Sequence, residues 1–182
     1  MPDAGKLAFI IGLGIGGFSL LLLIISVGTV TWLDDNSGSS VGLFRKCYGG
    51  NYTGTVAQGC YNENRAPQAG LSVFGILLLA FGIIVAIANI FLKRPILLII
   101  GLGLFYFASM FVMATYATWG HYSRTVALYV FPNVVSDDFP HTSMGASYHL
   151  CVAAHYFLWT ALTLLAFGAG YSAANGDSSS TS

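Results

Sequence analysis

The residues of this chain that could carry chemistry gather in polar segments between long apolar runs. Two of the three cysteines, Cys47 and Cys60, lie within one polar segment, and the third, Cys151, lies in an apolar run. An even pair in one segment favours a single disulfide bond in an oxidising compartment, without fixing its partners. The same segment contains a sequon that begins at Asn51, which is an acceptor for N-glycosylation if the segment is lumenal.

Two pairs of neighbouring carboxylates, Asp34-Asp35 and Asp137-Asp138, also lie in polar segments. General acid–base catalysis needs carboxylates that converge in a cleft with perturbed pKa values. The sequence supplies no nucleophile beside them and contains no serine-elbow, HExxH or P-loop pattern. We therefore expect no enzymatic activity, and we expect both pairs to be solvated or to contact a partner protein or cations.

His149, Cys151 and His155 stand close together in the last apolar run. Two metal ligands on one face of a helix need a spacing of three or four residues, whereas the two histidines are six apart and have no carboxylate near them. We expect no metal site here. Polar residues at membrane depth are nevertheless functional candidates, and Asn89 and His155 qualify; interhelical hydrogen bonding is the simpler account of both.

The glycine-rich stretch of residues 12–17 formally satisfies the GxGxxG pattern. A dinucleotide site requires a preceding strand and a βαβ unit, and an apolar run offers neither. Gly12 and Gly16 are instead spaced as GxxxG, which lets two membrane helices approach closely. We expect helix packing at these positions and at Gly101, Gly103 and Gly168, and we expect no cofactor.

The composition is that of a membrane protein. The chain is 55% hydrophobic and only 8% charged, whereas about a quarter of the residues of a soluble domain are charged. The formal net charge is zero and no basic block is present, so a nucleic-acid partner is excluded on electrostatic grounds.

Four apolar runs are each about as long as the 20 or so helical residues that cross a bilayer. The first is too long for a signal peptide, and Trp32 stands where a cleavage site would be. We predict one domain over residues 1–182 with four transmembrane helices. They cover residues 7–30, 71–92, 96–119 and 147–171.

The short connection Lys93-Arg94-Pro95 requires an antiparallel hairpin of the second and third helices. Adjacent basic residues at a membrane edge favour the cytoplasm, although four further Arg and Lys residues lie in the opposite loops. We predict cytoplasmic termini, with residues 172–182 as a short disordered tail. Loops 31–69 and 120–146 would then be extracellular.

Short strands are predicted in both of these loops. Residues 125–131 (TVALYVF) are β-branched and aromatic, residues 29–33 have similar character, and so do the segments that flank Cys47 and Cys60. Turn residues separate the strands at 36–38 and 48–50. Because an isolated β-hairpin is only marginally stable in water, we expect the strands of both loops to form one small sheet that packs on the helix ends.

Four spans combined with the ordered pattern Trp…Gly-Leu-aromatic…Cys…Cys…Arg in the first loop resemble the claudin and peripheral-myelin-protein superfamily. The similarity in topology covers nearly the whole chain, but the motif itself occupies only this loop. Phe44 departs from the tryptophan that claudins usually carry at its position, and the spacing from Cys47 to Cys60 is longer than in most claudins. The matching residues are Trp32, Gly42, Leu43, Phe44, Cys47, Cys60 and Arg65.

The resemblance implies a left-handed bundle of four transmembrane helices that carries a small extracellular antiparallel β-sheet from the two loops. It implies a disulfide bond between Cys47 and Cys60. It also implies that Trp32 and Leu43 pack between the sheet and the bundle, and that Arg65 lies near the start of the second helix.

For function, the resemblance implies a plasma-membrane protein that mediates cell–cell adhesion or a paracellular barrier at junctions. Its partners would be the bilayer, further copies in the same or the opposing membrane, and other claudin-like proteins. Residues 48–59 carry no charge, which argues against a strongly charge-selective pore. The alternative is an auxiliary subunit of an ion channel or receptor. It is favoured by the long second loop and by a C-terminal residue that lacks the apolar side chain for a scaffold pocket.

Overall fold

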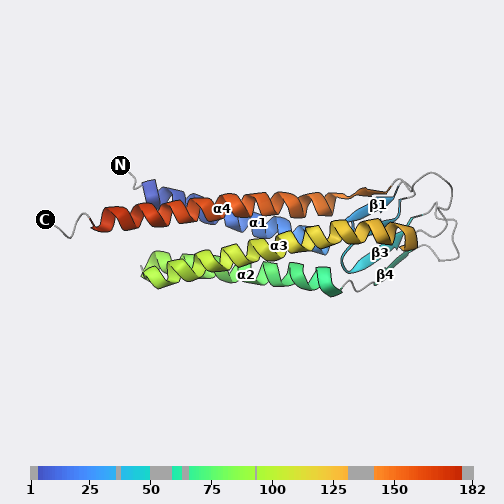
Figure 1. Ribbon diagram of the computed structural model, residues 1–182, viewed down its shortest axis with the longest axis horizontal. Coiled ribbons are helices and arrows are strands. Elements are labelled where there is room, and N and C mark those ends of the chain that lie inside the picture. Colours follow the sequence, from blue (N-terminus) through green and yellow to red (C-terminus); the bar gives the residue numbers. More distant parts are fainter. Residues whose placement is uncertain are drawn as a thin grey trace.

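A computed structural model describes residues 4–35, 38–49, 59–62, 66–92, 94–130 and 142–177. Its four helices are α1 (Ala4–Gly28), α2 (Ala66–Leu92), α3 (Pro95–Val130) and α4 (Ala146–Asp177). All four are long and apolar enough to cross a membrane. They form an elongated antiparallel bundle with both chain termini at one end and a β-sheet at the other, hereafter the sheet end (Figure 1). The predicted fold class is therefore confirmed.

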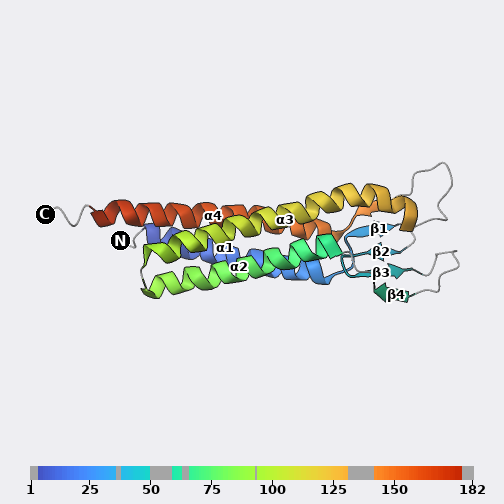
Figure 2. The ribbon, with the colours of Figure 1, turned by 60° about the horizontal axis from the view of Figure 1, so that its bottom comes forward.

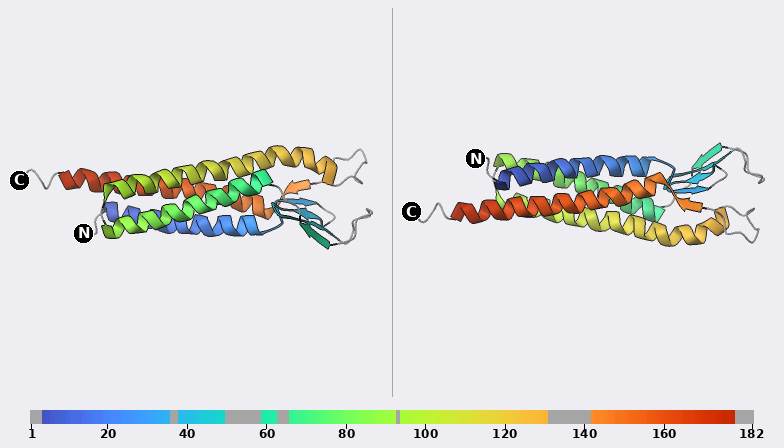
Figure 3. Two further views of the ribbon diagram at one scale, coloured as in Figure 1. Left: turned by 90° about the horizontal axis from the view of Figure 1, so that it is seen from below. Right: turned by 90° about the horizontal axis from the view of Figure 1, so that it is seen from above.

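The bundle is built from two closely packed pairs of helices. Helix α1 packs mainly against α4, and α2 packs mainly against α3, while the α1–α2 and α3–α4 contacts are less extensive. Both pairs are visible in Figure 3. Pro95 begins α3, where a missing backbone N–H costs nothing, and the N–H of Leu97 donates to the Arg94 carbonyl oxygen at 3.0 Å.

Glycines allow the closest approaches inside the bundle. A methyl group added at Gly16 of α1 would lie 2.8 Å from the ring of Phe105, and one added at Gly82 of α2 would lie 2.9 Å from the same ring. Phe105 is completely buried on α3. Its ring fits there because α1 and α2 each have a glycine, without a side chain, at the point of contact.

The predicted packing role of Gly12 agrees with this arrangement, because an added methyl would lie 3.1 Å from the Ala161 carbonyl oxygen of α4. Gly168 likewise meets Gly5 and Phe9 of α1. The same expectation is wrong for Gly103, which has no atom within 4 Å of an added methyl group.

Helix α3 is longer than predicted. It has 36 residues and continues to Val130, so the predicted strand at 125–131 is wrong for residues 125–130. The β-branched residues there extend a helix that the bilayer-length segment has already nucleated, and adding a residue to an existing helix costs far less than starting one. Helix α4 extends in the same way to Asp177, through the first part of the predicted disordered tail.

The sheet has five antiparallel strands in the order β4-β3-β2-β1-β5 (Figure 2). Four come from the first loop and one from the second, as the prediction of one sheet from two loops requires. Strand β1 begins at Leu33, so residues 29–32 of the predicted strand are not part of it. The strands are β1 (Leu33–Asp35), β2 (Ser40–Val41), β3 (Arg45–Tyr48), β4 (Gly59–Asn62) and β5 (Thr142–Met144).

Candidate functional site

The sheet has one polar face and one mainly apolar face. Residues paired across neighbouring strands point to the same side, so the strand register assigns each side chain to a face. On the apolar face Leu33 and Val41 are buried, whereas Tyr61 at the β4 edge is 38% exposed. The polar face carries Asp34, Ser40, Ser143, Cys47 and Cys60, and the apolar face carries Leu33, Val41, Lys46, Tyr61 and Met144.

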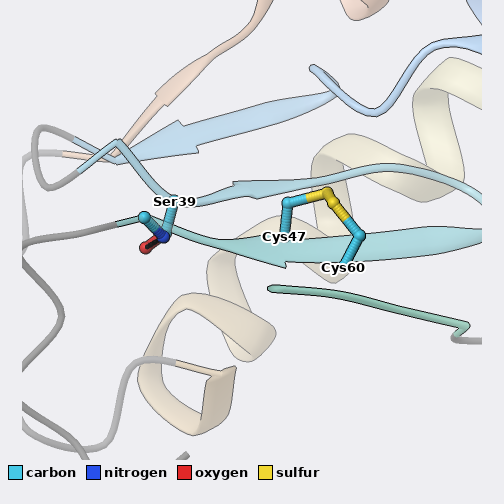
Figure 4. The surroundings of a disulfide bond; sticks show 4 residues. Ser39, Cys47 and Cys60 are labelled. Atoms are coloured by element: carbon cyan, nitrogen blue, oxygen red, sulfur yellow. Dashed lines mark hydrogen bonds between the residues drawn. A yellow bond between two sulfur atoms is a disulfide. The ribbon is translucent and has the colours of Figure 1, made fainter. Parts of the chain in front are cut away.

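A disulfide bond joins β4, at the edge of the sheet, to its neighbour β3. Cys47 of β3 and Cys60 of β4 are direct partners in the register, and their sulfur atoms are bonded (Figure 4). This is the pairing that the family resemblance implied. Beyond the end of β3, the N–H of Gly49 donates to Ser39 Oγ at 3.1 Å. Strands β3 and β4 are thus held together by a covalent bond as well as by their backbone hydrogen bonds, and the Ser39 hydroxyl adds a hydrogen bond between the segments that carry β2 and β3.

Trp32 joins the sheet to the bundle. Its side chain is fully buried, and its indole N–H donates to the carbonyl oxygen of Ser26 in α1 at 2.8 Å. Its ring meets that of Trp119 of α3 edge-on, with centroids 5.3 Å apart. Its backbone N–H donates to Val41, and its carbonyl oxygen accepts from Gly145, both at 3.1 Å. One residue therefore contacts α1, α3, β2 and the start of α4.

The turn between β2 and β3 lies against the same region. Leu43 is completely buried, and a methyl group added at Gly42 would lie 2.8 Å from the Val30 Cα, so only glycine fits there. Leu43 and Trp32 belong to one core cluster that includes helix residues, which places both where the resemblance put them. Phe44 differs, because its side chain is 42% exposed and does not act as a buried anchor.

A chain of hydroxyl groups that no sequence motif marks connects α1 to the start of α4. Ser147 Oγ lies 2.6 Å from Thr29 Oγ1 and 2.7 Å from Thr31 Oγ1, and the Thr29 hydroxyl also reaches the Ile25 carbonyl oxygen at 2.8 Å. Ser26 Oγ donates to the backbone carbonyl oxygen of Ser147 at 2.7 Å. The only sequence signal for this network is the presence of Ser and Thr at the ends of two apolar runs.

Asp34 is the carboxylate that the structure places nearest this junction. A methyl group added at Gly145 would come within 2.5 Å of Asp34 Oδ2, so the carboxyl group lies directly against the chain that enters α4. Burial raises the pKa of Asp34 above its ordinary value of 3.8. The other sequence candidates Asn51, Arg65, Asp137 and Asp138 lie outside the described residues, as does the side chain of Asp35.

Within the bundle, the sequence singled out His155 and Asn89 as polar residues, and His155 makes hydrogen bonds with two neighbouring side chains. It is 7% exposed, accepts the Trp159 indole N–H at Nε2 over 2.9 Å, and has Nδ1 3.2 Å from the Tyr116 hydroxyl oxygen. Its predicted interhelical hydrogen bond is therefore confirmed.

Asn89 is half-buried near the end of α2. Cys151 is buried, whereas His149 is exposed.

A scan against protein-family models and a search of curated proteins both return no match for this chain. The class of the protein is therefore defined by its structure. It is a multi-pass membrane protein with four candidate spans and a disulfide-bonded, five-stranded antiparallel sheet fixed to one end of the bundle.

Proposed function

We propose that this chain is a claudin-like protein of the plasma membrane that forms cell–cell contacts or a paracellular barrier through its two loops. It acts without catalysis, and both termini are cytoplasmic. The observation that carries the proposal is the rigid attachment of the sheet. Trp32, Gly145 and Ser147 join it to three helices, so contacts made by the sheet act on the whole membrane-embedded bundle.

The exposed part of the sheet is suited to protein contact. All four residues of the edge strand β4 are exposed, and Tyr61 meets Tyr48 edge-on with centroids 6.0 Å apart. Tyrosine is enriched in protein interfaces because it combines apolar area with a polar tip. The partners are further copies of this chain, within one membrane or across two, and other claudin-like proteins.

The test is expression of the chain in cells that have no junctional strands of their own. We expect enrichment where two expressing cells meet, with strands in freeze-fracture replicas. A variant with Tyr48→Ser and Tyr61→Ser reaches the surface but loses the enrichment, and Phe91→Ser, at an exposed site on the far end of α2, is the matched control. Uniform surface staining and smooth replicas for the unmodified chain would refute the proposal.

An auxiliary role beside a channel or receptor is the second candidate, and the outer surface of α1 favours it. Gly14 and Gly17 have no atom within 4 Å of an added methyl group, so they leave a shallow strip that a partner helix could approach closely. Capture from native membranes in mild detergent separates the two functions. A co-purifying channel that is lost with Gly14→Leu/Gly17→Leu supports the auxiliary role, whereas recovery of the chain only with its own copies supports adhesion.

A further inference from the structure

The exposed apolar side chains locate the middle of the membrane-spanning part. The large exposed apolar residues of α1 lie within residues 7–25, and those of α2 lie within residues 73–92. At the helical rise of about 1.5 Å per residue, these ranges measure about 27 and 29 Å, close to the bilayer core of about 30 Å. Their midpoints fall at Gly16 and Gly82, and both glycines contact the ring of Phe105. The layer around Phe105 is therefore the middle of the bilayer.

Tyr156 of α4 lies in this middle layer. The Ser19 hydroxyl of α1 donates to the Ala154 carbonyl oxygen of α4 at 2.7 Å. Counting along the two antiparallel helices from this contact places Tyr156 level with Gly17, next to the midpoint of α1. The Tyr156 side chain is 70% exposed. Because a tyrosine side chain is much shorter than the half-thickness of about 15 Å, its hydroxyl group does not reach water.

The Tyr156 hydroxyl differs from the other hydroxyl groups on the outer face of α4. Thr160 and Thr163 are also exposed, but each donates to a carbonyl oxygen of its own helix, at 3.0 and 2.9 Å. A phenol hydroxyl is too far from its own backbone to do so, and that of Tyr156 makes no hydrogen bond with any residue that the structure describes. A polar group in hydrocarbon is costly until it finds a hydrogen-bond partner.

The outer face of α2 shows what a purely lipid-facing surface looks like in this chain. Every exposed residue from 73 to 92 is Val, Leu, Ile or Phe. The outer face of α4 has Tyr156, Thr160 and Thr163 in its place. This composition is typical of a membrane helix that contacts another helix, in which hydroxyl groups find partners.

The outer face of α1 has a hollow at the same depth as Tyr156. Gly14 and Gly17 have no atom within 4 Å of an added methyl group. They stand between Ile10 and Leu21, each 59% exposed, and this spacing puts all four positions on one side of the helix. The glycines expose the backbone of α1, whose carbonyl groups point toward the sheet end. The Tyr156 side chain leans toward the same end, because helix side chains lean toward the N-terminus of their own helix.

A second copy of this chain brings these two faces together. Copies in one membrane have the same orientation, so Tyr156 of one copy lies at the depth of Gly17 of another. An acyl chain has no acceptor for the phenol, whereas the exposed backbone of α1 has carbonyl oxygens. We propose that copies within one membrane associate through α4 of one copy and α1 of the next. The Tyr156 ring fills the hollow at Gly14 and Gly17, and its hydroxyl donates to a backbone carbonyl oxygen of α1. Each pair leaves one face of each kind unoccupied, so the contact can repeat from copy to copy.

The test is disulfide cross-linking in membranes isolated from cells that co-express two differently tagged full-length copies. Cys151→Ala in both copies removes the one free thiol. One copy has Ile10→Cys and the other has Thr163→Cys, two positions at equal depth on the two faces that leave Tyr156 in place. We expect mild oxidation to give a dimer with both tags. In the matched control, Ile87→Cys on the exposed face of α2, close to the same depth, replaces Ile10→Cys and gives several-fold less dimer.

Two substitutions in this background probe the contact itself. Tyr156→Phe removes only the hydroxyl group and lowers the yield of mixed dimer about fivefold. Gly17→Leu fills the hollow and abolishes the mixed dimer. Tyr106→Phe and Gly103→Leu on α3 are the matched controls, because Tyr106 is exposed and Gly103 has no atom within 4 Å of an added methyl group. Melting temperatures in detergent close to that of the parent chain show that the variants fold.

Mixed dimers no more abundant than dimers of two Thr163→Cys copies would overturn the proposal, because they would indicate a symmetric contact of α4 or random collision. Equal losses with Tyr156→Phe and Tyr106→Phe would also overturn it. The pairing deepens the proposed function by naming the contact between copies in one membrane, and isolated membranes test it without cell contacts. Mixed dimers from a chain that shows no enrichment where cells meet would support the pairing and refute adhesion. Enrichment without mixed dimers would do the reverse.

Discussion

Trp32 and Trp119 are neighbouring buried indoles that differ in one hydrogen bond. Trp32 donates to the Ser26 carbonyl oxygen at 2.8 Å, whereas the buried Nε1 of Trp119 has no acceptor among the described residues. Replacing either ring by Phe removes a similar volume, so the difference between the two variants isolates the bond. We expect Trp32→Phe to be the more destabilising, by about 1 kcal/mol. Melting temperatures in one detergent measure the difference, and equal losses would contradict the assigned bond.

Asp34 introduces a pH dependence at the junction of sheet and bundle. Its folded-state pKa is raised above 3.8, so the folded state favours the neutral acid and the ionised form costs stability. Stability from this residue is therefore highest below about pH 4 and falls as the pH rises through the folded-state pKa. We expect Asp34→Asn to have a higher melting temperature than wild type at pH 7, with the difference shrinking toward pH 4. A difference that does not change with pH would rule out this cause.

At the scale of residues, the sequence identified the members of the first-loop motif but not their partners. Trp32 and Leu43 were expected at the interface of sheet and bundle because the motif marks them. Trp119, Ser147 and Tyr116 carry no such mark, since an aromatic or hydroxyl residue in an apolar run can equally face lipid or a neighbouring helix. Whether such a residue faces lipid or a neighbouring helix depends on how its helix is rotated about its own axis. Membrane helices are only weakly amphipathic, so the sequence does not reveal this rotation.

At the scale of helices, Phe105 and the two glycines that receive its ring form one unit. Gly82→Ala places a methyl group 2.9 Å from the ring, and overpacking of this kind costs about 1–3 kcal/mol. We expect the loss to be largely relieved by Phe105→Leu in the same chain, since the smaller side chain vacates the space. Denaturation in mixed micelles of the single and double variants gives the coupling energy.

Gly103→Ala provides the control for this coupling. It lies on the same helix as Phe105 but has no atom within 4 Å of an added methyl group, so we expect no loss, or a gain of up to about 1 kcal/mol from helix propensity. Purely additive effects of Gly82→Ala and Phe105→Leu would show that the ring is not the constraint.

The disulfide bond stabilises strands rather than helices. It closes a loop with a sequence separation of 13 residues, for which the loss of chain entropy in the unfolded state corresponds to roughly 3 kcal/mol. In Cys47→Ser/Cys60→Ser we expect hydrogen exchange to accelerate in β3 and β4 while α1 and α4 keep their protection. Equal acceleration in the helices would show that the sheet and the bundle unfold as one unit.

The sequence predicted the number of helices correctly but not all of their lengths. Apolar runs mark the part of a helix that the bilayer requires, and helix ends beyond the bilayer depend on other factors. Residues 125–130 have the composition of a strand, yet they continue α3. Strand β5 was missed because its three residues show no alternation of their own, and it exists only through its pairing with β1.

For the molecule as a whole, the proposed topology places the sheet outside the cell and both ends of the chain inside. After mild reduction, we expect a membrane-impermeant thiol reagent to label Cys47 and Cys60 on intact cells. Ala174→Cys, at an exposed site near the end of α4, reacts only after permeabilisation. Labelling of Ala174→Cys in intact cells, or of Cys47 and Cys60 only in permeabilised ones, would overturn the orientation. The buried thiol of Cys151 serves as the unreactive internal reference.

Gly145 alone separates β5 from α4, and the paired strand β1 follows closely after α1. No long flexible linker therefore lies between the sheet and these two helices. A pulling force on the sheet would be transmitted along the backbone into α1 and α4. The hydrogen bonds of the Ser147 hydroxyl would resist sliding of α1 against α4. If the chain forms the cell–cell contacts proposed above, mechanical tension on the sheet would therefore be carried directly by α1 and α4.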